Sequence, residues 1–187
     1  MNTMIRKICF CLVAFLGAAV LAGCAANTVV PLNYSLVASP GQACRGPMTV
    51  LKFKDAREQR SLGRDADGNL LRPATDVADW VGWSLYEELS ALSCPVEYHG
   101  IRKDEGARTI LSGEVVDVRL MPMGKTVWKA KVSVLLNVER EGKVIVARTF
   151  SAEREKPIIF GVSSREEVLT EALQGVMEQM VSMALTS

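Results

Sequence analysis

The chain has 187 residues, with 22 basic and 21 acidic side chains, 49% hydrophobic residues, one histidine and five cysteines. This length suits one domain with a hydrophobic core, and the apolar content argues against disorder over the whole chain. The charge balance argues against nucleic acid as a partner, because phosphate binding needs uncompensated Lys and Arg, and the single histidine, His99, excludes most metal sites and catalytic triads.

The N-terminal residues have the pattern of a lipoprotein signal peptide. Arg6 and Lys7 precede an apolar run from Ile8 to Ala22, which is short for a membrane span but suits a signal-peptide core. The run ends in Leu21-Ala22-Gly23-Cys24, which resembles the bacterial lipobox, where the cysteine thiol is lipidated and the chain is cut before it. We therefore predict a signal peptide over residues 1–23, lipidation of Cys24, and a lipid-anchored tether over residues 24–47.

The residues after Cys24 bear on the destination of the protein. Ala25 and Ala26 follow, with no aspartate. By resemblance to the enterobacterial sorting rule, this favours the inner leaflet of the outer membrane, facing the periplasm, with the inner membrane as the alternative.

The cysteines predict a disulfide in the exported domain. Cys9 and Cys11 leave with the signal peptide and Cys24 carries the lipid, so Cys44 and Cys94 remain in an oxidising compartment. We predict a bond between these two residues. The alternative is a pair of buried free thiols.

The first half of the domain, residues 48–187, is predicted as strand, loop, helix and strand. Met48–Lys54 forms a short strand, and the polar, turn-rich residues 55–73 form a long loop. A helix begins at Thr75 or Asp76, both good N-caps, and ends near Leu92. A short strand follows at Val96–His99.

The second half is predicted as a strand meander followed by a helix. The predicted strands are Thr109–Leu120 with a bulge at Gly113, residues 128–139, and Lys143–Glu153 after a hairpin turn. The last helix begins at Ser164, with Glu167 completing a capping box, and ends near Leu185. The order β-α-β-β-β-β-α predicts an α+β fold with a mostly antiparallel sheet of four to five strands and both helices on one face.

No residues of the chain form a recognisable catalytic or cofactor site. His99 has no candidate nucleophile, and the standard phosphate-binding glycine loops are absent from the sequence. Asp65, Asp67 and Asn69 have the spacing of a calcium loop, but Leu70 stands where that loop needs glycine, so a polar turn is the better interpretation. We therefore predict no enzyme activity, no metal site and no cofactor.

Aromatic side chains on the first predicted helix lie off its apolar stripe. At 100° per residue, Trp80, Trp83 and Tyr86 fall outside the stripe that Val77 begins, among acidic residues. Two interpretations stay open: the rings pack onto neighbouring loops, or they form a partner-binding face, since exposed Trp and Tyr are typical interface anchors.

The order of elements also resembles known families. The lipobox, the strand that ends in Phe53-Lys54-Asp55-Ala56-Arg57, and the following loop, helix, meander and helix resemble small Gram-negative lipoproteins of the YajG type and the auxiliary lipoproteins of envelope ABC transporters. The resemblance implies a non-catalytic accessory protein that is membrane-bound through its lipid and binds an envelope protein. The alternative is a lipoprotein that holds a small ligand or lipid between sheet and helices.

Overall fold

The computed structural model describes residues 27–37, 44–102, 108–159 and 163–187. The predicted signal peptide, the lipobox and the predicted lipidation site Cys24 lie outside the described residues.

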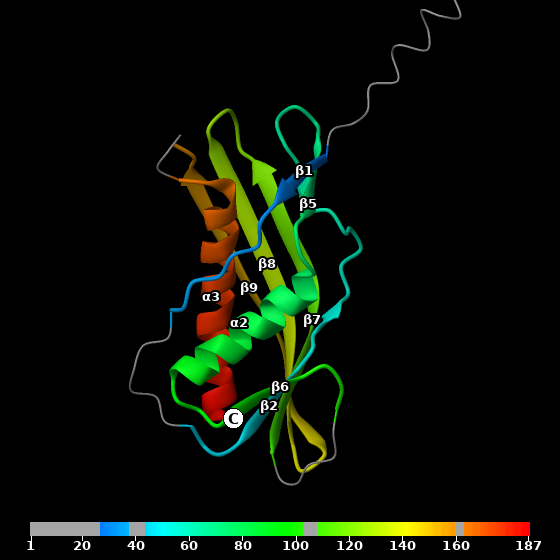
Figure 1. Cartoon of the computed structure of the whole chain (residues 1–187), viewed down its shortest axis with the longest axis vertical. Coiled ribbons are helices and arrows are strands. Elements are labelled where there is room, and N and C mark those ends of the chain that lie inside the picture. The colour runs from blue at the N-terminus through cyan, green and yellow to red at the C-terminus, as the bar shows by residue number, and fades with distance from the viewer. Residues whose placement is uncertain (1–26, 38–43, 103–107, 160–162) are drawn as a thin grey trace, which may run out of the picture.

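A six-stranded mixed sheet carries two helices on one face (Figure 1). Its strands lie in the order β6-β2-β7-β8-β9, and β3 also pairs with β7. The short strands make the parallel pairs: β2 pairs with β6 and with β7, and β3 pairs with β7. The long strands β7, β8 and β9 form an antiparallel meander. The strand bounds are β2 Met48–Leu51, β3 Lys54–Asp55, β6 Val96–His99, β7 Thr109–Pro122, β8 Val127–Arg140 and β9 Lys143–Pro157. The α+β class is as predicted, but the strand count and the parallel pairings differ from the prediction.

The helices of the described residues are α2 (Val77–Ala91) and α3 (Arg165–Thr186). Asp76 caps α2 as predicted: its carboxylate accepts the backbone N–H groups of Ala78 and Asp79 at 2.8 and 3.0 Å. The predicted capping box of α3 is wrong, because the Ser164 side chain makes no cap hydrogen bond.

The core lies between the sheet and both helices. Alternate residues of β8, from Trp128 to Val138, face the helices and are buried, as the predicted alternation required. The predicted bulge at Gly113 is wrong, because the register shifts at Val116 instead. Gly113 serves close packing: a Cβ there would overlap the Leu135 carbonyl oxygen and the Phe53 ring.

A second, three-stranded sheet replaces part of the predicted loop and tether. It consists of β1 (Asn27–Val30), β5 (Leu70–Pro73) and β4 (Gly63–Arg64), in that order. The 55–73 segment is therefore not one irregular loop, since β3, β4 and β5 interrupt it. Each of these strands is too short to show a period in the sequence.

Residues 31–37, which we call the strap, pass across α3 (Figure 1) and are hydrogen-bonded to both α2 and α3. The Asn33 carbonyl oxygen accepts hydrogen bonds from the Trp80 indole of α2 at 3.0 Å and the Thr170 hydroxyl of α3 at 2.9 Å. The Gln174 side chain donates to the Ser35 carbonyl oxygen at 2.8 Å. This part of the predicted tether is therefore packed on the domain, because its backbone carbonyls find donors on two helices.

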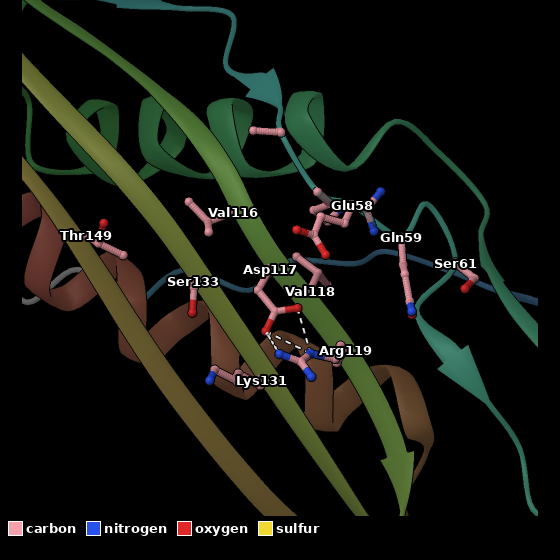
Figure 2. Close-up of a pocket in the computed structure, with 12 residues that line it drawn as sticks. Glu58, Gln59, Ser61, Val116, Asp117, Val118, Arg119, Lys131, Ser133 and Thr149 are labelled. Atoms are coloured by element: carbon pink, nitrogen blue, oxygen red, sulfur yellow. Dashed lines mark hydrogen bonds and ion pairs between the residues drawn. The ribbon is translucent and has the colours of Figure 1, made fainter.

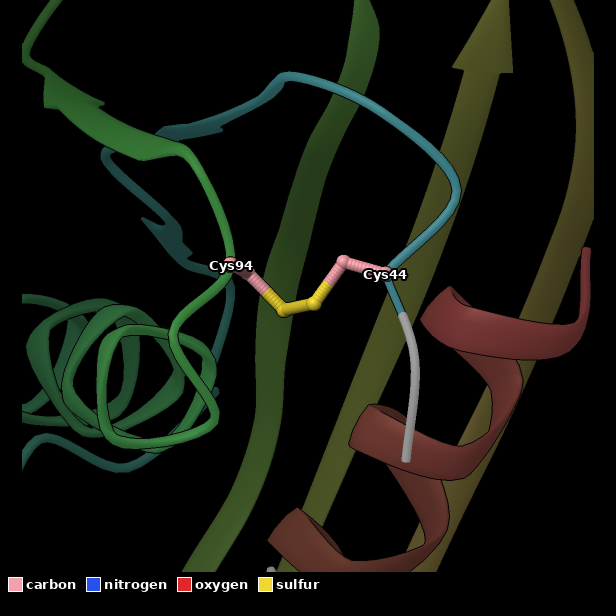
Figure 3. The surroundings of a disulfide bond; sticks show 2 residues. All are labelled: Cys44 and Cys94. Carbon is pink, nitrogen blue, oxygen red and sulfur yellow. A yellow bond between two sulfur atoms is a disulfide. The ribbon is translucent and has the colours of Figure 1, made fainter. Parts of the chain in front are cut away.

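A disulfide joins Cys44 to Cys94 with a Cα–Cα distance of 5.5 Å (Figure 3). Cys44 precedes β2 and Cys94 lies between α2 and β6. Because β2 and β6 are parallel neighbours, helix α2 returns the chain to the same end of the sheet, which brings the two cysteines together.

We expect loss of this bond to destabilise the domain. The cysteines are 50 residues apart, and in the chain-entropy account a loop of this size contributes about 4 kcal/mol. The double variant Cys44→Ala/Cys94→Ala should therefore lower the unfolding free energy by about that amount in a urea titration. An unfolding midpoint equal to that of the oxidised wild-type protein would contradict the expectation.

Candidate functional site

Three aromatic rings form a partly exposed group on α2 and β6, which we call the aromatic surface: Trp83, Tyr86 and Tyr98. Trp83 is 46% exposed. Its ring stacks on Tyr98, with centroids 4.3 Å apart and planes at 19°, and meets the edge of Tyr86 at 5.3 Å. These ring contacts restrict the orientation of the large, exposed Trp83 side chain.

The structure separates Trp80 from the other predicted interface residues. Trp80 is only 7% exposed, and the strap covers it, with the indole N–H donating to Asn33. Trp80 is thus a core residue, and Tyr98 takes the third place in the aromatic group. The sequence indicated only that Tyr98 lies in the short predicted strand Val96–His99, directly after the helix that carries Trp83.

Acidic side chains of the same helix lie near the aromatic surface. The sequence has no Lys or Arg between Arg72 and Arg102. Asp79 accepts a hydrogen bond from the Tyr98 hydroxyl at 3.4 Å and pairs with Lys52, the residue after β2, at 2.9 Å. Burial and the nearby Asp79 carboxylate raise the pKa of Tyr98 to about 12, so this hydroxyl stays protonated at neutral pH.

A buried carboxylate holds the strap against the opposite side of α2. Glu88 is 1% exposed and accepts hydrogen bonds from the Tyr34 hydroxyl and, at 2.8 Å, from the backbone N–H of Val37. Burial, followed by the Glu88 interaction, raises the pKa of Tyr34 well above its usual range. Helix α2 is therefore fixed on one side by the sheet and on another by the strap.

We expect the two tryptophans of α2 to respond differently to truncation. Trp80→Ala removes a buried ring and its hydrogen bond, and should lower the unfolding free energy by about 3–5 kcal/mol. Trp83→Ala removes a half-exposed ring and should cost about 1 kcal/mol. Urea titrations of both variants test this, and equal losses would contradict the assignment of Trp80 to the core and Trp83 to the surface.

A hollow of about 490 Å³ lies on the face of the main sheet opposite the helices (Figure 2). Strands β7, β8 and β9 form its floor, and residues 56–61 form one wall. It is lined by Ala56, Arg57, Glu58, Gln59, Ser61, Val116, Asp117, Val118, Arg119, Lys131, Ser133 and Thr149. The alternative prediction placed a ligand pocket between sheet and helices, where the described residues instead form the packed core.

Arg57 is the most buried charged residue of the hollow. Its Nε and Nη2 donate to the two carboxylate oxygens of Asp55 at 2.9 Å each, while its buried Nη1 has no hydrogen-bond partner among the described residues. The hydrogen bond from Arg57, opposed in part by burial, lowers the pKa of Asp55 to about 2. This pair lies within the Phe-x-Asp-x-Arg step of the sequence and fixes the start of the 56–61 wall.

The lowered pKa of Asp55 predicts a loss of stability in acid. The carboxylate stabilises the fold above its unfolded pKa of about 4, and this contribution of about 2 kcal/mol is lost as the pH falls toward 2. Thermal unfolding between pH 5 and 2 should show the loss. Asp55→Asn should flatten this part of the curve, and an unchanged slope in Asp55→Asn would contradict the prediction.

The calcium-like sequence forms a hairpin turn between β4 and β5. The Asp65 carboxylate accepts the backbone N–H groups of Asp67 at 3.0 Å and Asn69 at 2.8 Å. Gly68 adopts φ +83°, which favours glycine. Within the described residues, no group of three or more His, Cys, Asp or Glu side chains is placed to hold a metal ion. No helix among those residues has the length and apolar character needed to span a membrane.

Comparison with known proteins identifies the fold. The sequence matches no family model and no curated protein. Protein XCC0632 from Xanthomonas campestris, described by family model DUF330, is similar with a TM-score of 0.62 and 16% identity, over 85% of this chain and 95% of that one. An uncharacterized protein gives a TM-score of 0.50 at 13% identity over 84% and 96% of the two chains, and the hypothetical protein CT253 from Chlamydia trachomatis gives 0.50 at 9% over 76% and 97%. At these identities the similarity establishes a shared fold.

Proposed function

We propose that this chain is a lipid-anchored accessory protein of the bacterial envelope that binds another envelope protein through the aromatic surface and catalyses no reaction. The observation that carries the proposal is the exposed Trp83 ring, held in place by its stack on Tyr98. The lipobox at Leu21–Cys24 supports the anchor, and Ala25 and Ala26 support the periplasm-facing leaflet of the outer membrane. The same proposal includes the YajG-type or transporter-auxiliary assignment, which rests on the order of elements.

The chemistry of the aromatic surface supports protein binding. Trp and Tyr rings bury large areas at a low cost in side-chain entropy, and stacking lowers that cost further for Trp83. The exposed carboxylate of Glu87 lies on the same helix, which has no basic residue, whereas Asp79 is already paired with Lys52. A matching partner surface would therefore present an apolar patch beside Lys or Arg side chains.

A photoreactive residue in place of Trp83 tests the proposal in living cells. We expect ultraviolet light to link it repeatedly to the same envelope protein. The same substitution at Glu178, which is exposed on α3, should give no such product and serves as the matched control.

Binding by the purified components should then be measured with the captured protein. Trp83→Ala should weaken binding by about 2 kcal/mol, a roughly thirtyfold rise in Kd, because exposed tryptophans of this kind act as hot spots. Equal crosslinking from residues 83 and 178, or an unchanged Kd for Trp83→Ala, would overturn the assignment of the interface. A blank at both positions in a folded, anchored protein would favour a small ligand in the hollow beside Arg57.

A further inference from the structure

The start of β1 and three chain connections lie at one end of the domain (Figure 1). Asn27 pairs with Leu70, directly after the 65–69 turn. At the same end, the Ile158 N–H donates to the Thr126 carbonyl oxygen at 2.7 Å and links the β9–α3 connection to the β7–β8 turn. We call this the anchor-proximal end: residues 27–29, 65–69, 123–126 and 158–159.

Three large apolar side chains are exposed at the anchor-proximal end. Val29 is 62% exposed, Met123 53% and Ile159 55%. The opposite end also exposes apolar residues, since Val144 in the β8–β9 hairpin is 58% exposed. Apolar exposure therefore does not by itself decide which end of the domain faces a membrane.

The length of the link to the anchor decides between the two ends. Cys24 precedes Asn27, the first residue of β1, by three positions. Three residues span at most about 10 Å even when fully extended. The strap and β1 pack on the domain, so residues 27–37 cannot lengthen the link unless they detach.

We propose that the anchor-proximal end rests on the bilayer surface, with Val29, Met123 and Ile159 at the boundary between headgroups and acyl chains. This inference rests on lipidation of Cys24 in the proposed function, but is independent of the partner. Acyl chains hold the protein to the leaflet, and the short link brings this end against it, where apolar side chains gain by leaving water. The domain then stands on the membrane in one orientation, with its long strands directed away from the lipid.

Fluorescence quenching in vesicles tests the orientation. Full-length lipidated protein with a fluorophore on Met123→Cys is reconstituted into phosphatidylethanolamine–phosphatidylglycerol vesicles that contain a lipid with a nitroxide headgroup. We expect the nitroxide lipid to lower the emission at position 123. Position 144, labelled through Val144→Cys, is the matched control, because the 14 residues of β8 separate the two ends by roughly 45 Å.

Flotation of the vesicles separates failure of the orientation from failure of the anchor. If the protein floats with the vesicles but emission falls equally at positions 123 and 144, or at neither, the orientation is wrong and the lipid anchor stands. If the protein does not float, the anchor is wrong and the orientation falls with it. Ile159→Cys provides a second labelling position at the same end should Met123→Cys fail to fold, and it should also be quenched.

Discussion

The burial of helix α2 between the main sheet and the strap is the constraint on which much of the structure depends. A helix that covers a sheet ordinarily leaves one side in water, but α2 is buried on two sides, so even Glu88 is 1% exposed. A buried carboxylate is tolerated only with donors, and the strap supplies them from Tyr34 and Val37. Removing the strap would expose Trp80 and leave the Asn33 contacts to both helices unmade. The strap is therefore part of the packed domain and not a free tether.

This arrangement also explains why the aromatic surface can remain exposed without unfolding the helix. The stability of α2 comes from its sheet-facing and strap-facing sides, together with the Asp76 cap. Its remaining side is free to carry Trp83 and Tyr86, with Tyr98 of β6 beneath. The disulfide joins Cys94, in the connection between α2 and β6, to Cys44 ahead of β2, and so ties this connection to the segment that leads into the neighbouring strand.

Prediction from the sequence succeeded for elements in which apolar side chains recur at a regular spacing over many residues. It failed for segments that are held in place by their backbone atoms. Strand β8 alternates from Trp128 to Val138 except at Leu135, and α2 has an apolar stripe with an aspartate cap, so both could be predicted. Strands β1, β4 and β5 have two to four residues each, too few to show a period. The strap is held in part by the carbonyl oxygens of Asn33 and Ser35, which are backbone atoms that every residue has, so the sequence left open whether Trp80 packs on a neighbouring segment or faces a partner.

The residues of the aromatic surface also differ in how far the sequence predicts them. Trp83 was predictable from its angle on the helix, whereas Tyr98 comes from another element and depends on which strand lies beside α2. The strand pairings locate Tyr98 in the sheet: β6 pairs with β2, and β2 pairs with the first residues of β7. The start of β7 lies at the end of that strand opposite the β7–β8 turn, which we propose to lie at the membrane. In the proposed orientation the aromatic surface would therefore belong to the half of the domain that points away from the lipid, and a partner bound at Trp83 would not need to touch the leaflet.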